Sequence, residues 1–188
     1  MRACTPVETN RGLTLVEVII ATALFTVATL AAAHLMVWAA RSLWGTGAQT
    51  LALAAAQAKL EELQSLAWHF DADGNRVSDL DTDLSTQPIS GGGPGLSPSP
   101  ANSLSESLDG YADYLDAEGR WIGNGTQAPA GAAYVRRWAV RPLPGAAEDT
   151  LVLQVLVTPL ATDANRRQQT SGRAAGESLL TSARTRVR

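Results

Sequence analysis

Residues 11–18 read RGLTLVEV, and they open an apolar run that continues to Ala40. Within residues 13–40, Glu17 is the only side chain that is certain to be charged at neutral pH. About 20 consecutive apolar residues are enough for a helix to cross a bilayer. Burial of a carboxylate inside such a helix costs a few kcal/mol of free energy. Glu17 is therefore predicted to have a function and to need a partner.

A cut after Gly12 would create that partner. Leu13 would then carry a new α-amino group, four residues before Glu17. Glycine has no side chain, so a peptidase could approach the Gly12 carbonyl closely. This arrangement predicts a processing site at Gly12 and Leu13 and an assembly role for Glu17.

The segment resembles the prepilin peptidase site of type IV pilins and of type II secretion pseudopilins. The pattern of that family is a short basic leader, a glycine, an apolar residue that is usually Phe, and then Thr-Leu-x-Glu. The matching residues are Arg2, Arg11, Gly12, Thr14, Leu15 and Glu17. Leu13 stands in the place of the usual Phe and keeps that position apolar. The resemblance implies that prepilin peptidase removes residues 1–12 and that the amine of Leu13 is then methylated.

Two other kinds of N-terminal segment share part of this pattern. A secretory signal peptide also has a basic start and an apolar core, and residues 31–33 are alanines that resemble its cut site. Its core is shorter, however, and has no acid. A plain single-span anchor explains the hydrophobicity but neither Gly12 nor Glu17. Prepilin processing therefore agrees best with the segment.

The composition agrees with one small domain outside the cytoplasm. A chain of 188 residues supports about one domain, and removal of residues 1–12 would leave 188 − 12 = 176 residues. Of the 15 basic and 18 acidic residues, Arg2, Arg11 and Glu8 lie in the leader, so the rest has a side-chain charge of 13 − 17 = −4. An excess of acid gives no overall attraction to nucleic acid, so no nucleic-acid partner is expected.

The leader also holds the single cysteine of the chain, Cys4. After removal of residues 1–12 no cysteine would remain, and the domain would depend on packing without a disulfide. Arg2 and Arg11 precede the apolar run, which places the leader in the cytoplasm by the positive-inside tendency. A single-pass protein of the bacterial inner membrane, with its C-terminal part in the periplasm, is therefore expected.

Residues 13–68 are expected to form one long helix, whose first part, about residues 13–40, is the transmembrane half. Beyond Ala40, apolar residues recur at spacings of three and four, as is typical of an amphipathic helix. The predicted apolar stripe consists of Leu53, Ala56, Leu60, Leu63 and Ala67. The polar surface is expected to hold Gln57, Lys59, Glu61, Glu62 and Gln64. At the join, Gly45 and Gly47 each cost roughly 1 kcal/mol of helix propensity, which marks a bend or a segment that loosens on assembly.

Residues 69–103 are expected to be a loop followed by a Gly/Pro/Ser-rich connector, residues 90–103, which is exposed and forms no core. Asp71, Asp73 and Asn75 resemble the opening of a calcium-binding loop, but the glycine is misplaced and the closing Glu is absent. Some pseudopilins bind calcium in a C-terminal loop. A solvated turn is the better interpretation of the segment from Asp71 to Asp83, and no cofactor is expected.

Residues 104–188 are expected to form β structure. Residues 111–123 predict a hairpin, and the segments that begin at Tyr134 and Thr150 predict two longer strands joined by a turn. The last residues, LLTSARTRVR, predict a final strand. A long helix followed by an antiparallel sheet is an α+β fold, and this order resembles the pilin architecture. Residues 109–121 and 134–144 are similar to minor pilins of the pilus-modification class.

Catalytic chemistry is not indicated by the sequence. His34 in the apolar run and His69 near the helix end are the only histidines, and no cysteine accompanies them at a metal-binding spacing. The chain is therefore predicted not to be an enzyme. A patch formed by Arg136, Arg137, Arg141 and the terminal arginines would suit DNA in an uptake pilus, but the net negative charge favours a solvated strand face.

These observations predict a minor type IV pilin, a structural subunit that prepilin peptidase processes at the inner membrane. It would then enter an extracellular or periplasmic filament with other pilin subunits. Two alternatives remain open. One is a minor pseudopilin of a type II secretion system, and the other is a membrane-anchored binding module that does not polymerise.

Overall fold

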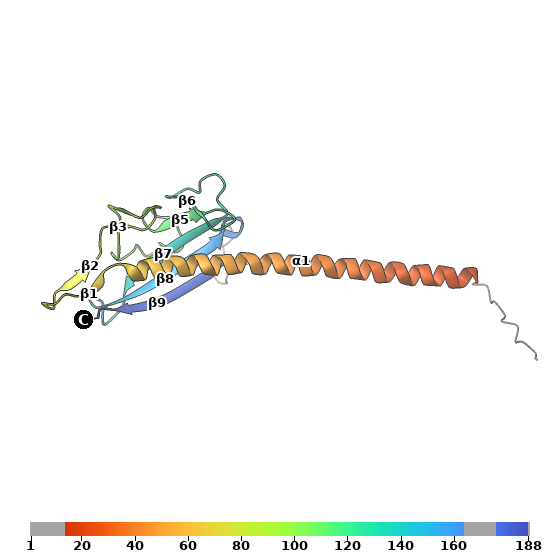
Figure 1. The fold of residues 1–188 in the computed structure, drawn as a ribbon, viewed down its shortest axis with the longest axis horizontal. Helices are drawn as coiled ribbons and strands as arrows, with labels where there is room; N and C mark the ends of the chain where they lie inside the picture. Colours follow the sequence, from red (N-terminus) through yellow and green to blue (C-terminus); the bar gives the residue numbers. More distant parts are fainter. Residues whose placement is uncertain (1–13, 164–175, 188) are drawn as a thin grey trace, which may run out of the picture. The chain divides into compact units, whose positions relative to one another are not determined.

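The computed structural model describes residues 14–163 and 176–187, and of residues 41–46 it describes the backbone only. A short helical turn, residues 160–163, lies outside the named elements. The order of one long helix and then antiparallel strands confirms the predicted α+β fold (Figure 1). The named elements are α1 (Leu15–Ser65), β1 (Trp68–Phe70), β2 (Arg76–Ser78), β3 (Thr82–Asp83), β4 (Ser90–Gly91), β5 (Ala112–Leu115), β6 (Trp121–Asn124), β7 (Tyr134–Pro142), β8 (Thr150–Pro159) and β9 (Ser178–Thr185).

The chain divides into two compact units, Met1–Leu43 and Trp44–Arg188. The first unit contains the segment Leu15–Ala40 of α1, which is long and apolar enough to cross a membrane, with a mean hydropathy of 2.2. The threonine hydroxyls in this segment donate to carbonyl groups of the preceding turn, for example Thr22 to Val18 at 2.9 Å. These hydroxyls need no water, which suits a lipid environment.

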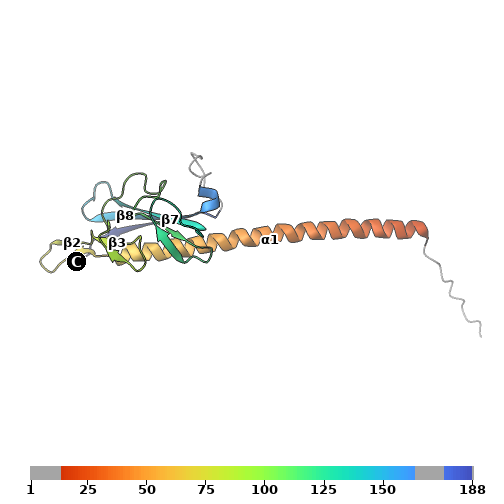
Figure 2. The ribbon, with the colours of Figure 1, turned by 90° about the horizontal axis from the view of Figure 1, so that it is seen from above.

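The second unit is built on a five-stranded antiparallel sheet with the order β6-β5-β7-β8-β9. The hairpin predicted for residues 111–123 is confirmed as β5 and β6. The two longer predicted strands are confirmed as β7 and β8, and the final strand as β9. Two views at right angles show the last turns of α1 alongside β7, β8 and β9 (Figures 1 and 2).

Both faces of the central strand β7 are covered. On one face, Trp138 and Val140 belong to the main apolar cluster together with Ala52, Ala56 and Leu63 of α1. On the other face, the buried side chain of Arg137 donates to the hydroxyl of Ser107 at 3.1 Å. Beyond the end of β5, Ser99 continues the pairing at the edge of β7: its main-chain N–H donates to the carbonyl of Val140 at 2.9 Å, and its hydroxyl accepts the Val140 N–H at 3.1 Å. Part of the connector that was predicted to be exposed is therefore packed, and Leu96 and Ser103 are buried.

The predicted apolar stripe of α1 is confirmed at Ala56 and Leu63, which are buried, and is wrong at Leu53, which is 45% exposed. Ala52 and Lys59 are buried as well. The prediction was wrong for Lys59, which was assigned to the polar surface. Its ammonium group meets a carbonyl and carboxylates inside the unit, so burial leaves none of its charge without a partner.

α1 ends at Ser65, and Trp68, the expected last residue of the helix, is buried in β1 instead. Arg184 of β9 donates to the carbonyls of Leu63 at 3.2 Å and Leu66 at 2.6 Å, so a basic side chain satisfies the last turn. β1 pairs with β2 and β3 with β4, so residues 68–91 contain two short hairpins within the segment that was expected to be a loop.

Candidate functional site

Glu17 lies in the first turn of α1, and its side chain is exposed. Gly12 and Leu13, the predicted processing site, lie outside the described residues. Among the residues that the structure describes, no basic group forms an ion pair with Glu17. The predicted partner, an amine at Leu13 of another subunit, stays a prediction.

The start of α1 shows a feature that sequence reasoning missed. The hydroxyl of Thr14 accepts a hydrogen bond from the N–H of Glu17 at 3.3 Å. Thr14 and Glu17 have the spacing of a capping box, in which Ser or Thr precedes Glu by three residues. A carboxylate in the first turn also interacts favourably with the helix dipole. Glu17 therefore supports the start of the helix, and the Thr-x-x-Glu pattern was a sequence signal for this role.

A second group of charges lies between α1 and the sheet. We name Lys59, Glu62, Asp113 and Arg136 the interface cluster. Lys59 Nζ lies 2.5 Å from Glu62 Oε2 and 3.3 Å from Asp113 Oδ2. It also donates to the carbonyl of Leu84 at 2.7 Å. The same ammonium group therefore ties α1 to β5 and to the segment that follows β3.

Arg136 completes the interface cluster on the other side of Asp113. Its Nε and Nη2 donate to the two oxygens of Asp113 at 2.9 and 2.7 Å, and its Nη1 donates to the Ala55 carbonyl of α1 at 3.1 Å. Asp113 is fully buried, and two cations compensate its charge. With two cations and two carboxylates the cluster is neutral, and it fastens the helix to the sheet.

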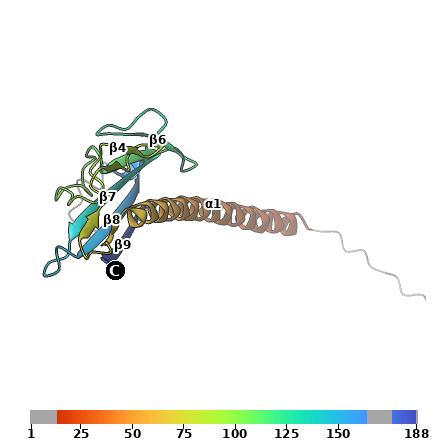
Figure 3. The same ribbon diagram turned by 60° about the vertical axis from the view of Figure 1, so that its left-hand side comes forward.

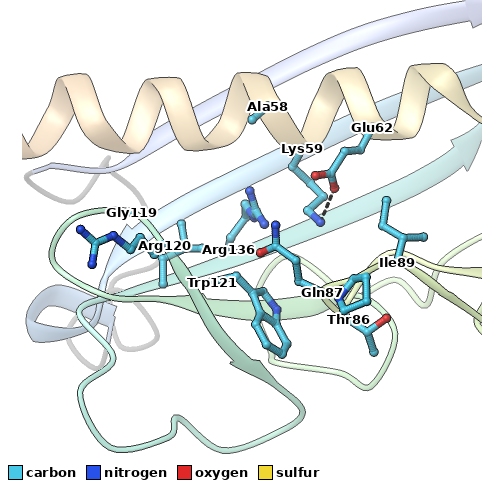
Figure 4. A pocket seen from close by; sticks show the side chains of 12 residues that line it. Ala58, Lys59, Glu62, Thr86, Gln87, Ile89, Gly119, Arg120, Trp121 and Arg136 are labelled. Carbon is cyan, nitrogen blue, oxygen red and sulfur yellow. Dashed lines mark ion pairs between the residues drawn. The ribbon is translucent and has the colours of Figure 1, made fainter.

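An open cavity of about 870 Å³ adjoins the interface cluster. Figure 4 shows Lys59 and Glu62 extending from α1, with Gln87 and Trp121 on the opposite side. The lining contains no His or Cys, and Lys59 and Glu62 are paired with each other. The lining offers neither a nucleophile beside a base nor a set of metal ligands, so it gives no support to catalysis.

The strand arginines do not form the predicted solvated face. Arg137 is buried on the face away from α1, and its Nη1 and Nη2 donate to the two oxygens of Asp163 at 2.7 and 2.9 Å. Arg136 is buried in the interface cluster, and of the three arginines of β7 only Arg141 is exposed. The prediction was wrong because both buried guanidinium groups meet carboxylates from distant parts of the chain.

Arg186 ties the end of the described chain to the β1–β2 hairpin. It donates to the carbonyl of Val77 and to the hydroxyl of Ser78, each at 2.6 Å, and its guanidinium lies 3.4 Å from the ring centre of Trp68. Burial lowers the pKa of Arg186, the charge of Arg76 lowers it further, and Asp149 opposes this change. Arginine remains protonated in proteins, so Arg186 acts as a permanent cation.

Asp71 closes its own turn with hydrogen bonds. Its Oδ1 accepts the N–H groups of Asn75 at 2.7 Å and Asp73 at 3.0 Å, and its Oδ2 accepts the Asn75 side-chain amide at 3.0 Å. The bond from the Asn75 side chain is the main reason why the pKa of Asp71 is lowered. Within residues 14–163 and 176–187, no three His, Cys, Asp or Glu side chains are arranged to hold a metal ion.

Calcium is therefore expected to leave the stability of the fold unchanged. The melting temperature of the detergent-extracted chain should be the same with calcium as with a chelator, because both Asp71 oxygens already accept hydrogen bonds. As a control, Asp71→Ala should lower the melting temperature equally in both conditions. A calcium-dependent rise that Asp71→Ala removes would contradict this expectation.

The N-terminal segment matches a known family profile. Residues 9–33 match the family described as Prokaryotic N-terminal methylation motif. The matched residues include Gly12, Leu13 and Glu17 and the first turns of α1. The match indicates a precursor of the type IV pilin or pseudopilin kind, and such a motif implies prepilin peptidase processing and assembly with other pilin subunits. No curated protein and no solved structure matches the chain.

Proposed function

We propose that the chain is a minor type IV pilin, a non-catalytic structural subunit of a pilus-like filament. The observation that carries this proposal is the methylation motif of residues 9–33 at the start of a helix whose segment Leu15–Ala40 can cross a membrane. A signal peptide or a plain anchor needs the apolar helix but not this motif. In the α+β unit the charges of the interface cluster are paired with one another and hold the helix on the sheet. This structural use of the charges suits a subunit that acts by binding its neighbours.

In this mechanism the subunit is anchored in the bacterial inner membrane before assembly, with the unit Trp44–Arg188 in the periplasm. Prepilin peptidase removes residues 1–12, and the new amine of Leu13 is methylated. Apolar helices of neighbouring subunits then pack together in the filament core, where Glu17 of one subunit neutralises the amine of Leu13 in another. Opposite charges in such a low-dielectric core attract strongly.

A minor pseudopilin of a type II secretion system is the second candidate, because the same motif and chemistry serve both machines. A gene deletion separates them. Loss of surface pili with normal protein secretion supports the pilin, and loss of secretion with normal pili supports the pseudopilin.

The mature chain is expected to begin at N-methylated Leu13. Mass spectrometry of the membrane-extracted protein and N-terminal sequencing measure this directly. Gly12→Val should block processing, because a β-branched side chain prevents close approach to the carbonyl, whereas Asn10→Ala in the same leader should be processed normally. A chain that starts after Ala33 would identify a secretory signal peptide and overturn the proposal.

Assembly is tested separately in filaments sheared from the cell surface. The mature chain is expected in the filament fraction as well as in the membrane fraction. A correctly processed chain that remains only in the membrane, in cells that make filaments, would favour the anchored binding module.

A further inference from the structure

β9 is an outer strand of the five-stranded sheet. Figure 3 shows β6 and β9 at the two ends of the sheet. β9 is eight residues long, and it pairs with β8 from Val157–Ser178 to Thr150–Thr185 without a bulge. One side of its main chain therefore faces away from the sheet.

The register shows which residues face outward. In an antiparallel pair every second residue exchanges hydrogen bonds with the partner strand, and the residues between them direct their N–H and C=O groups away. Just after β9, the N–H of Arg186 donates to the carbonyl of Asp149 at 2.8 Å, so Arg186 and every second residue before it face β8. The outward-facing residues, which we name the open edge, are Leu179, Thr181, Ala183 and Thr185.

A contact at the end of the open edge confirms this alternation. The carbonyl of Val187, the next residue in the same series, accepts the N–H of Phe70 at 3.0 Å, and Val187 bridges His69 in parallel. Just beyond β9, the same outer side of the chain therefore already forms a main-chain hydrogen bond with β1. From Leu179 to Thr185, no other part of the described chain bonds to the outward main-chain groups.

The open edge has few of the devices with which proteins usually prevent strand addition. β9 contains no Lys and no Pro, and its pairing with β8 is regular. Its one charged residue, Arg184, is bonded to the carbonyls of Leu63 and Leu66 in α1 and is not part of the open edge. Thr181, Ala183 and Thr185 are exposed, small and uncharged. The opposite edge strand, β6, has four residues and lies beside a register shift at Tyr114/Leu115, which makes it a poorer template.

A polar face of α1 borders the open edge on one side of the sheet. Gln64 donates to the hydroxyl of Ser182 at 3.0 Å, and Gln57 donates to Glu61 at 3.2 Å. These three helix residues follow one another at spacings of four and three, so they share one face of α1. A strand added to β9 would place alternate side chains beside this face, where the carboxylate of Glu61 favours a basic residue.

The direction of α1 argues against a second β9 as the added strand. Ala48 of α1 lies near Gly176, before β9, and Gln64 lies at Ser182, so this part of α1 and β9 run in the same direction. Two copies of one edge pair about a two-fold axis as antiparallel strands, because parallel pairing needs a stagger between them. In such a pair the last turns of α1 would run in opposite directions in the two copies, so a different subunit suits the edge better.

We propose that the open edge binds an extended segment of a different pilin-like subunit by strand addition. The side chains of the added segment that lie beside Thr181 and Ala183 are uncharged. On the side of the sheet that carries α1, the added segment has a basic residue next to Glu61. Main-chain hydrogen bonds supply affinity and alternate side chains supply specificity, as in other cases of β-augmentation. The identity of the partner as a filament subunit rests on the proposed function.

Two proline variants distinguish the outer edge from the inner one. Ala183→Pro removes an outward N–H, so it should leave the melting temperature of the full chain unchanged, since edge strands tolerate proline. Ser182→Pro removes an N–H that bonds to β8, so it should lower the melting temperature clearly. Equal losses in both variants would mean that the outer edge is already paired within the chain, which overturns the proposal.

Binding is measured in cells with a photo-crosslinking residue in place of Thr181, and with one in place of the exposed Glu118 as the control. The position of Thr181 should form an adduct with another protein that has a prepilin-type N-terminus, and Glu118 should not. Ala183→Pro should reduce this adduct about fivefold, the effect of losing one hydrogen bond of ordinary strength.

The proposal is overturned by the absence of an adduct at Thr181, or by an adduct only to a second copy, to the chain itself or to proteins without the motif. The experiment does not depend on polymerisation, because it detects partners in the membrane as well. A specific subunit adduct in cells that incorporate no chain into filaments would remove the filament function and leave strand addition standing.

Discussion

Asp113→Ala is expected to lower the free energy of unfolding by about 3–5 kcal/mol, the range for removal of one member of a buried ion pair. Asp113 is fully buried and pairs with both Arg136 and Lys59. Without it, two buried cations lose their shared counter-ion. Because small proteins are stable by only about 5–15 kcal/mol, this loss removes a large part of the total stability.

Denaturant unfolding of the detergent-extracted chain, followed by the β signal in circular dichroism, measures this loss. Asp113→Asn should also be strongly destabilising, since it keeps the shape but removes the charge. Asp109→Ala, at an exposed aspartate nearby in the sequence, should stay close to wild type.

A quadruple variant separates charge from packing. Lys59→Met, Glu62→Gln, Asp113→Leu and Arg136→Met together remove all four charges of the interface cluster, and replacement of a buried ion-pair network by apolar side chains is often neutral or stabilising. The quadruple variant should therefore recover most of the stability that Asp113→Ala loses. If it unfolds as easily as the single variant, the unpaired charge is not the cause.

Glu17→Ala is expected to reduce incorporation into filaments about tenfold or more, while processing and membrane insertion continue. An uncompensated amine of Leu13 in the filament core would cost several kcal/mol, and about 1.4 kcal/mol already corresponds to tenfold. Glu17→Gln should behave similarly, because it keeps the size of the side chain without its charge. The measurement compares the amounts of mature chain in sheared filaments and in membranes.

Thr14→Ala is the matched control, because Thr14 caps the same turn of α1. Loss of a cap costs about 1 kcal/mol of helix stability but leaves the carboxylate of Glu17 in place. Incorporation should therefore stay near the wild-type level. If Thr14→Ala and Glu17→Ala fail to the same extent, Glu17 acts through the helix start and not through a neighbouring subunit.

The parts of the fold that the sequence predicts correctly depend on local patterns. The apolar segment Leu15–Ala40 and the strands β7 and β8 are visible in composition and alternation alone. Glu17 is prominent in the sequence because it is a charge among apolar residues, and the Thr-x-x-Glu cap is an equally local signal for its second role. Gly12 and Leu13 remain predictions, because they lie outside the described residues.

Two of the errors concern charged residues whose partners lie elsewhere in the chain. Lys59 finds Leu84 and Asp113, and Arg137 finds Asp163. A basic residue in an amphipathic pattern is assigned to the surface by default, since burial needs a specific opposite charge. The opposite charges, Asp113 and Asp163, are distant in the sequence from Lys59 and Arg137. Only the folded structure shows that they meet.

The two arginines near the end of the described chain also determine when the second unit can finish folding. Arg184 bonds to Leu63 across 121 positions, and Arg186 bonds to His69 across 117 positions. Contacts between such distant residues form late, because the long loop between them must close first. The unit therefore completes its fold only after its last strand is present. A chain interrupted before Arg184 would leave the last carbonyls of α1 unsatisfied and Trp68 uncovered, which makes it a substrate for proteolysis before it can join an assembly.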